Sequence, residues 1–262
     1  MSLPLQNSVF LVLLLCFATS ASAQSPSTLP THQHPPIPST DNEQFVAYWT
    51  SETGWMSELQ LRNNLVGQDL TVTPALRLSD GEETVLAPIT IKPHEVKSID
   101  LNAAILGAAA PQLIGAYGSV VLRYHSFHAG NLYAAVMVHN IGHPFVFHID
   151  AIGQTPFLET ASREGVWWLP KETTTDYLVL TNQSNETIPV GVSLYGANGK
   201  EAKQKPLVLG PRETSRYSIR KLVQAAGFAG SYGGIRVSTN AHAGSLDTLH
   251  VFLMRRLDFL PY

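Results

Sequence analysis

The sequence predicts an all-β protein made of two tandem antiparallel β-sandwich domains, each with one short crossover helix. Three observations predict this fold: an internal repeat in constant order, apolar residues that alternate with polar ones, and Asp-Gly or Asn-Gly pairs placed for hairpin turns. The 262 residues are 44% hydrophobic and 14% charged, which is typical of a globular chain rather than a disordered or polytopic membrane protein.

Residues 1–23 predict a signal peptide. An apolar run from Val9 to Ala18 is followed by small residues and by an A-x-A cleavage pattern that ends at Ala23. Because this run is too short to cross a bilayer, an uncleaved anchor is the weaker alternative, and we expect no integral membrane segment after cleavage. The expected location is secreted, periplasmic or cell-surface. The only cysteine, Cys16, lies in this segment, so the mature chain forms no disulfide.

The rest of the chain divides by composition and by repetition. Residues 24–43 are rich in Pro, Ser and Thr and predict a disordered leader. Two repeats are then expected at 44–150 and 163–256, with a linker at 151–162 and a tail at 257–262.

The repeat is carried by motifs that recur in the same order. Their offset falls from 119 residues to 114, as small deletions in loops would produce. The matched motifs are Tyr48-Trp49 with Trp167-Trp168, Leu59-x-Leu61-x-Asn63 with Leu178-x-Leu180-x-Asn182, Asp80-Gly81 with Asn198-Gly199, Pro93-x-Glu95 with Pro211-x-Glu213, Tyr117-Gly118 with Tyr232-Gly233, and His128-Ala129-Gly130 with His242-Ala243-Gly244.

Each repeat contains a strand of period two before its glycine turn. In residues 70–78, Leu70 and alternate residues are apolar, and we expect Thr71, Thr73, Ala75 and Arg77 to face water. Residues 188–194 follow the same pattern. The Asp-Gly and Asn-Gly pairs predict type I′ turns, after which residues 84–91 and 202–209 fold back as strands.

Later segments complete the expected sandwich. Residues 132–138 are apolar on both faces and predict a central strand. Residues 101–109 and 219–226 predict the crossover helices. Six or seven short strands in about a hundred residues fit an immunoglobulin-like or related Greek-key sandwich.

These motifs together resemble the tandem immunoglobulin-like β-sandwich repeats of uncharacterised secreted bacterial proteins. The resemblance covers both repeats, and each matching element is a strand or a turn. It implies placement at the cell surface or in the periplasm and a binding or scaffolding role, and it brings no catalytic residues.

Charge is distributed unevenly between the two halves. Residues 41–150 hold eleven acidic and five basic side chains, a net of −6, whereas residues 151–262 hold nine acidic and twelve basic, a net of +3. Opposite signs can favour packing of the halves on each other, but two solvated surfaces are the plainer interpretation. Because neither half has a dense Lys/Arg cluster, we expect no nucleic-acid partner.

Four histidines of the first repeat are the weak candidates for a metal site: His125, His128, His139 and His143. Imidazoles are common zinc ligands, but spacings of three and four residues suit a helix better than a strand. Because His128 recurs as His242 in the same His-Ala-Gly turn, a structural role for His128 is the simpler interpretation. We therefore expect no metal, no cofactor and no catalytic residues.

Trp55 is the candidate for ligand binding. Trp49 and Trp168 take the same repeat position and are expected in the two cores. Trp55, by contrast, aligns with Thr174 of the second repeat and follows Gly54. An exposed indole can stack on sugars or anchor a protein partner. The expected function is thus an exported, non-enzymatic binding, adhesion or scaffold protein with a protein or glycan partner. The alternative is a metal-dependent hydrolase that uses the histidines of the first repeat.

Overall fold

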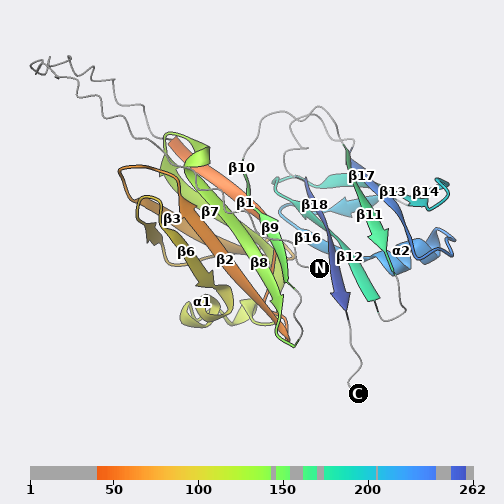
Figure 1. Ribbon diagram of the computed structural model, residues 1–262, viewed down its shortest axis with the longest axis horizontal. Helices are drawn as coiled ribbons and strands as arrows, with labels where there is room; N and C mark the ends of the chain where they lie inside the picture. The colour runs from red at the N-terminus through yellow and green to blue at the C-terminus, as the bar shows by residue number, and fades with distance from the viewer. Residues whose placement is uncertain are drawn as a thin grey trace, which may run out of the picture. The chain divides into compact units, whose positions relative to one another are not determined.

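A computed structural model describes residues 40–142, 146–153, 162–169, 174–204, 206–239 and 249–257 of the chain (Figure 1). These residues form antiparallel β-sheets with two short α-helices, which confirms the predicted all-β sandwich class. The predicted signal peptide lies outside the described residues, as does nearly all of the predicted leader. Residues 38–262 form one compact unit, so the structure does not divide the predicted repeats into separate domains.

The first pair of sheets contains the strands from β1 to β10. Sheet A has the order β10-β1-β7-β3-β4, with β5 also paired to β3, and sheet B has the order β6-β2-β8-β9. Strand β1 begins at Thr40, so residues 40–43 belong to sheet A rather than to the leader. The strands are β1 Thr40–Thr50, β2 Trp55–Asn63, β3 Leu70–Leu78, β4 Glu83–Val85, β5 Ile89–Ile91, β6 Val96–Asp100, β7 Tyr117–Ser126, β8 Leu132–Asn140, β9 Val146–Asp150 and β10 Ile152–Gly153.

The second pair of sheets contains the remaining strands. Sheet C has the order β11-β17-β13-β14, with β15 also paired to β13, and sheet D has the order β16-β12-β18. Strands β11, β17, β13 and β14 of sheet C thus correspond in order to β1, β7, β3 and β4 of sheet A. Strands β16, β12 and β18 of sheet D correspond to β6, β2 and β8 of sheet B. The strands are β11 Ser162–Trp168, β12 Thr174–Asn182, β13 Ile188–Gly196, β14 Glu201–Lys203, β15 Leu207–Leu209, β16 Thr214–Ser218, β17 Tyr232–Thr239 and β18 Leu249–Leu257.

The two helices lie where the sequence predicts them. Helix α1 (Leu101–Gly107) connects β6 of sheet B to β7 of sheet A, and α2 (Ile219–Ala225) connects β16 to β17. Each begins after a capping side chain: Asp100 accepts a hydrogen bond from the backbone N–H of Ala103, and Ser218 accepts one from Lys221. Two short 3-10 turns, Pro111–Leu113 and Ala129–Asn131, complete the helical residues that the structure describes.

The Leu-x-Leu-x-Asn motif places a buried asparagine side chain at the last residue of β2 and of β12. The side-chain nitrogen of Asn63 donates to the carbonyls of Gln68 and Ile91, at 2.9 and 3.0 Å, and its oxygen accepts from the N–H of Leu65. Asn182 makes the corresponding bonds in the second pair of sheets. The asparagine therefore satisfies loop backbone groups that a buried apolar side chain would leave unpaired.

Both predicted hairpins form, but the predicted type I′ turns are wrong. Only the glycines have positive φ, +91° at Gly81 and +77° at Gly199. The N–H of Gly81 donates to the carbonyl of Leu78, and the N–H of Leu78 donates to that of Glu82. This is a three-residue loop with a glycine bulge, which places the left-handed conformation on glycine alone and spares the Asp or Asn that a type I′ turn would strain.

The strand after each turn is split into two short pieces. The predicted strand 84–91 corresponds to β4 and β5, and 202–209 corresponds to β14 and β15. Both pieces still pair with the strand before the turn.

We expect alanine to be worse tolerated at Gly81 than at Gly199. Both glycines have positive φ, so alanine costs about 1 kcal/mol at either position. At Gly81 an added Cβ would also lie 2.8 Å from the carbonyl oxygen of Pro211, whereas nothing lies within 4 Å at Gly199. Gly81→Ala should therefore cost about 2 kcal/mol and Gly199→Ala about 1 kcal/mol in urea denaturation. Equal losses would contradict the close packing of the first turn on Pro211.

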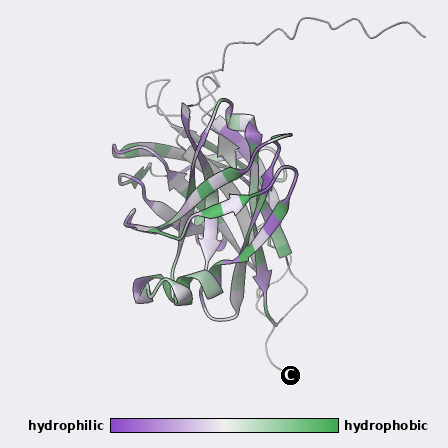
Figure 2. Ribbon diagram, turned by 90° about the vertical axis from the view of Figure 1, so that its left-hand side faces the viewer, coloured by the Kyte–Doolittle hydropathy of each residue, from purple (hydrophilic) through white to green (hydrophobic). Residues whose placement is uncertain are grey.

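The buried apolar residues form two large clusters, one between sheets A and B and one between sheets C and D. Figure 2 shows apolar (green) and polar (purple) residues along the strands, and buried and more exposed residues alternate along β2. The first cluster centres on Trp49, Leu59 and Val136. The second centres on Trp167, Leu178 and Val192.

Trp167, rather than Trp168, takes the place of Trp49. Trp49 pairs with Gly118, and Trp167 pairs with Gly233, the matching glycine of the repeat. Trp168 is 47% exposed, so the prediction that Trp49 and Trp168 are the equivalent core residues is wrong. The physical reason is a register shift in β1 between Val46 and Trp49, a bulge that adds one residue relative to β11.

The outer face of sheet D contacts the first pair of sheets. Val179 belongs to the first core cluster, and the hydroxyl of Thr181 donates to the carbonyl of Ala47 at 2.9 Å. The N–H of Thr214 donates to the carbonyl of Ser79 at 2.9 Å. We call this contact the junction. Because its hydrogen bonds are buried and satisfied, it resembles a protein interior.

An ion pair joins the acidic and basic halves at the junction. The two terminal nitrogens of Arg216 bind the carboxylate of Glu52 at 2.6 and 2.9 Å, and one of them also donates to the Tyr48 hydroxyl at 3.1 Å. The guanidinium lies 3.6 Å from the ring centre of Tyr117. Burial raises the pKa of Tyr48 to about 12. Glu52 of the acidic half and Arg216 of the basic half are thus in direct contact.

The expected solvent face of β3 is only partly exposed. Thr71 is exposed, but Ala75 and Arg77 are buried, contrary to the simple alternation. Ala75 packs with Phe45 and Val121 in a small apolar cluster. The guanidinium of Arg77 lies 5.5 Å from the Phe45 ring and donates to Gln183 of the second half at 3.0 Å. Tertiary contacts therefore bury this end of the outer face of sheet A.

Candidate functional site

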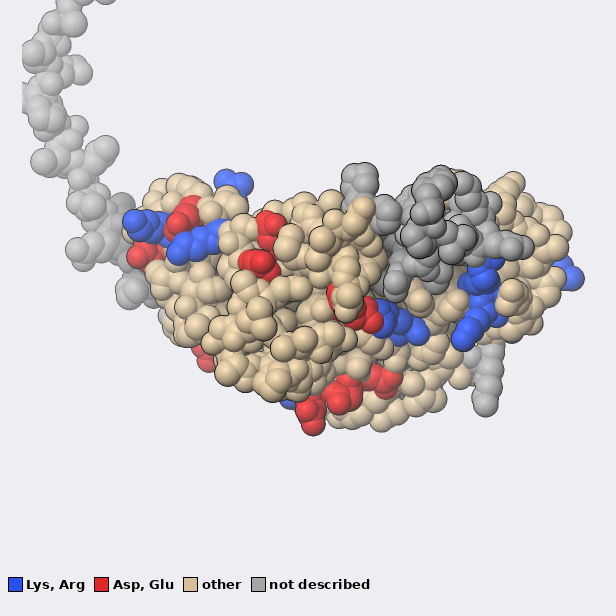
Figure 3. All heavy atoms as spheres, turned by 90° about the horizontal axis from the view of Figure 1, so that it is seen from below, with Lys and Arg blue, Asp and Glu red and all other residues tan. Residues whose placement is uncertain are grey.

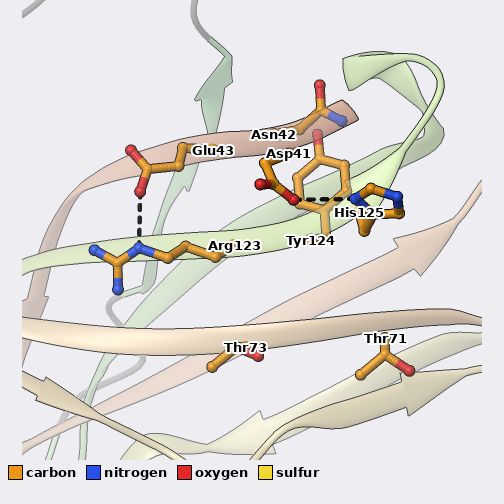
Figure 4. A pocket seen from close by; sticks show the side chains of 8 residues that line it. All are labelled: Asp41, Asn42, Glu43, Thr71, Thr73, Arg123, Tyr124 and His125. Carbon is orange, nitrogen blue, oxygen red and sulfur yellow. Dashed lines mark hydrogen bonds and ion pairs between the residues drawn. The ribbon is translucent and has the colours of Figure 1, made fainter. Parts of the chain in front are cut away.

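An open hollow of about 670 Å³ lies on the outer face of sheet A (Figure 4). Three neighbouring strands of the sheet line it. Its residues are Asp41, Asn42 and Glu43 from β1, Thr71 and Thr73 from β3, and Arg123, Tyr124 and His125 from β7. We call it the sheet A hollow.

Strand register brings acidic and basic side chains together across the hollow. Asp41 is directly opposite His125, and Glu43 is directly opposite Arg123. The carboxylate of Asp41 lies 3.0 Å from the imidazole Nδ1, and that of Glu43 lies 2.7 Å from the guanidinium Nε. Residues two apart in a strand share a face, so both pairs lie side by side, as Figure 4 shows. Thr73 lies opposite Arg123 on the other side.

Arg123 is the centre of a charge network that extends beyond the hollow. Its two terminal nitrogens bind the carboxylate of Glu83 on β4 at 2.6 and 2.9 Å. Glu83 also accepts a hydrogen bond from the Nε of Arg77 at 3.0 Å. The bond to Glu83 is the largest cause that raises the pKa of Arg123, and the bond from Arg123 is the largest cause that lowers the pKa of Glu83. These charge-assisted hydrogen bonds hold the side chain of Arg123 in a defined position in the hollow.

We expect Glu83 to make stability depend on pH in acid. Its folded pKa is lowered below the ordinary 4.5, so its stabilising effect is complete above that value and is lost as the pH falls through the folded pKa. Glu83→Gln should therefore reduce the loss of unfolding free energy below pH 4.5, measured by urea denaturation from pH 7 to pH 3. Glu82→Gln, at the exposed neighbouring carboxylate, is the matched control. Identical curves for wild type and Glu83→Gln would contradict the network.

The chemistry of the hollow suits noncovalent binding of polar groups. Asp41 has a side chain that is 99% exposed, and Glu43 and Arg123 are each about one-third exposed. The hydroxyl side chains that line the hollow from β3 are Thr71 and Thr73, whereas the side chain of Tyr124 belongs to the first core cluster. Burial raises the pKa of Tyr124 to about 12, and its hydroxyl donates to the carbonyl of Ala129. Exposed carboxylate oxygens are strong acceptors for the hydroxyl or amine donors of a ligand.

The four candidate histidines do not form one cluster in the described part of the chain. His125 lies in the hollow, while His128 accepts a hydrogen bond from the N–H of Gly130 at 2.9 Å and so caps a 3-10 turn. His139 lies seven residues along β8 from Leu132, about 23 Å from that turn at the rise of a strand. It faces Glu58 at 3.7 Å. His143 lies outside the described residues.

The described residues also contain no group of three or more His, Cys, Asp or Glu side chains placed to hold a metal ion. The structural interpretation of His128, as a residue of the turn, agrees with its capping bond.

Trp55 is buried rather than exposed. Its side chain is 4% exposed, belongs to the first core cluster and lies 6.0 Å from the ring of Phe147. The prediction of an exposed indole is wrong because Trp55 begins β2 with its side chain on the core side of sheet B. A buried ring has no free face on which a sugar or a partner can stack.

Sequence reasoning did not find the acidic and basic residues of the hollow. The available signal was their spacing, since Asp41 and Glu43 are two apart and so are Arg123 and His125. This spacing places each pair on one face of a strand but does not say which strands are neighbours. On the face shown in Figure 3, acidic side chains lie over the left-hand and central parts, and the only charged side chains seen at the right-hand end are Lys and Arg.

Comparisons with known proteins add no relative. The sequence matches no protein-family model, and no curated protein is significantly similar to it. The resemblance to tandem immunoglobulin-like repeats therefore stays a prediction. Of the helices that the structure describes, none has the length and hydrophobicity to span a membrane.

Proposed function

We propose that this chain is an exported, non-enzymatic binding or scaffold protein that recognises a polar ligand, a protein or a glycan, through the sheet A hollow. The observation that carries the proposal is the row Glu43–Arg123–Thr73 across three strands. Export is inferred from the apolar run and A-x-A pattern of residues 9–23. The expected location is secreted, periplasmic or cell-surface.

We infer that the two pairs of sheets are two copies of one folding unit. The matching strand orders and the equivalent positions of Trp49 and Trp167 support this view. Two copies provide an internal comparison, because a residue that the fold itself requires should recur in both.

The charged row of the hollow does not recur in the second copy. By strand register, Glu43, Arg123 and Thr73 correspond to Ser162, Ser238 and Gly191. The same strands thus pair in sheet C without these charges. Since the fold does not require the row, we infer that it serves recognition.

The second copy also supplies the substitutions that test the function. Glu43→Ser combined with Arg123→Ser gives the first copy the residues of the second, and Glu83 keeps its bond to Arg77. Wild-type mature protein should bind defined members of a glycan array or a peptide array, and the double variant should lose that binding. The variant should retain the far-UV circular dichroism of wild type.

A matched control lies on sheet C. Arg236 is an exposed arginine that pairs with Glu164 at 2.6 Å, at the position that Val121 takes in sheet A. Arg236→Ser should leave binding unchanged. Failure of the wild type to bind any glycan or peptide, or equal binding by the double variant, would contradict the proposal.

A further inference from the structure

Strand β8 of sheet B pairs with a neighbour on each edge. One neighbour is β2, and the other is β9, which pairs antiparallel from Ala135 opposite Asp150 to His139 opposite Val146. Two alternate residues of β9, Phe147 and Ile149, pack against the first core cluster. The edge strand therefore closes the core as well as the backbone ladder.

Strand β18 takes the place of β8 in sheet D. Leu249 is opposite Asn182 as Leu132 is opposite Asn63, so the offset between the copies is 117 here rather than the predicted 114. Residues 252–256 of β18 then correspond to residues 135–139 of β8, the part that β9 covers. Within the ranges that the structure describes, no strand pairs with this second edge of β18.

We propose that the open edge of β18 accepts an antiparallel strand from a partner protein, in the position that β9 takes on β8. The inference rests on the proposed binding role but not on the hollow, which lies on a different sheet. Adding a strand satisfies the unpaired backbone groups of an edge and gives affinity through main-chain hydrogen bonds. In the first copy, β9 occupies this position on β8.

The register defines the chemistry of the partner strand. By analogy with Phe147 and Ile149, it needs two large apolar residues spaced two apart. Positions 255 and 256 of β18 are both arginines, where β8 has Val138 and His139 opposite Phe147 and Val146. An acidic residue at the N-terminal end of the partner strand, in the position of Val146, would lie opposite Arg256 and form a favourable cross-strand pair.

Hydrogen exchange read residue by residue tests whether the edge is open. In an antiparallel ladder, alternate N–H groups point to opposite neighbours. In the free mature protein, we expect alternate amides of residues 252–256 to exchange rapidly, while all amides of residues 135–139 are protected. Slow exchange at every amide of 252–256 would show that the chain itself already fills the edge and would overturn the proposal.

A peptide of residues 144–152, which contains β9, is the probe for strand addition. We expect it to bind and to protect the fast amides of β18. The same peptide with Val146→Glu should bind roughly two- to five-fold more tightly, since it places a carboxylate opposite Arg256. A peptide with Phe147→Ser and Ile149→Ser should bind more than about tenfold more weakly.

Absence of binding, or binding that leaves the β18 amides unprotected, would overturn the proposal. The hollow variant Glu43→Ser/Arg123→Ser should bind the peptide as wild type does. Loss of array binding in that variant and loss of strand addition are therefore separate results, and each refers to its own site.

Discussion

Gly118→Ala is expected to lower the unfolding free energy by about 4 kcal/mol. An added Cβ at this position would lie 1.8 Å from the carbonyl oxygen of Arg77, far inside van der Waals contact. That oxygen also accepts the hydrogen bond from the indole nitrogen of Trp49, at 3.1 Å. Alanine must therefore displace the backbone of β3 at Arg77 and weaken the bond that holds the buried indole of Trp49.

Gly233→Ala should have a similar effect in the second pair of sheets. There the added Cβ would lie 2.0 Å from the carbonyl oxygen of Tyr195 and 2.7 Å from the Trp167 ring. Gly67→Ala is the control, because nothing lies within 4 Å of its added Cβ, and it should change stability by less than about 0.5 kcal/mol. Urea denaturation measures all three. A loss below about 1 kcal/mol at Gly118 would contradict the close approach.

Arg216→Met is expected to cost about 3 kcal/mol because it breaks the ion pair at the junction. The side chains of Arg216 and Glu52 are 18% and 29% exposed, so the variant leaves a mostly buried carboxylate without its partner. It also removes the donor to the Tyr48 hydroxyl and the stacking on Tyr117. Methionine keeps much of the length of the side chain, which limits the loss of packing.

Arg236→Met is the matched control for the junction. Arg236 pairs with Glu164 at 2.6 Å and lies 5.4 Å from the ring of Tyr195, but the pair is about half exposed. An exposed pair contributes little, so this variant should lose much less unfolding free energy than Arg216→Met. Calorimetry and urea denaturation compare the two variants. Equal losses would show that burial at the junction does not strengthen the Arg216 pair.

Local patterns in the sequence predicted the elements of the fold well. The alternation over residues 70–78 predicted β3 with its observed bounds, and the segments after Asp100 and Ser218 form the two expected helices. The glycine pairs marked both hairpins, although the turn type differed. These features depend on side-chain periodicity, capping and backbone freedom within a few residues of each other.

The candidate site was much harder to predict. Asp41 and His125 are 84 residues apart in sequence, and Glu43 and Arg123 are 80 apart. They meet only because β1 and β7 are neighbours in sheet A with one particular register. Trp55 was expected at the surface because the second repeat has no matching tryptophan, but its side chain lies in the core.

The amino-acid sequence alone determined where strands, turns and helices form and that a set of motifs recurs, because short-range sterics and hydrophobic periodicity act within each segment. Only the tertiary structure decided which strands are neighbours, where the bulge in β1 places Trp49, and how Arg77 becomes buried and Arg216 partly buried. Those outcomes depend on register and packing between segments tens of residues apart, and a one-residue shift in register reverses the face of every side chain in a strand.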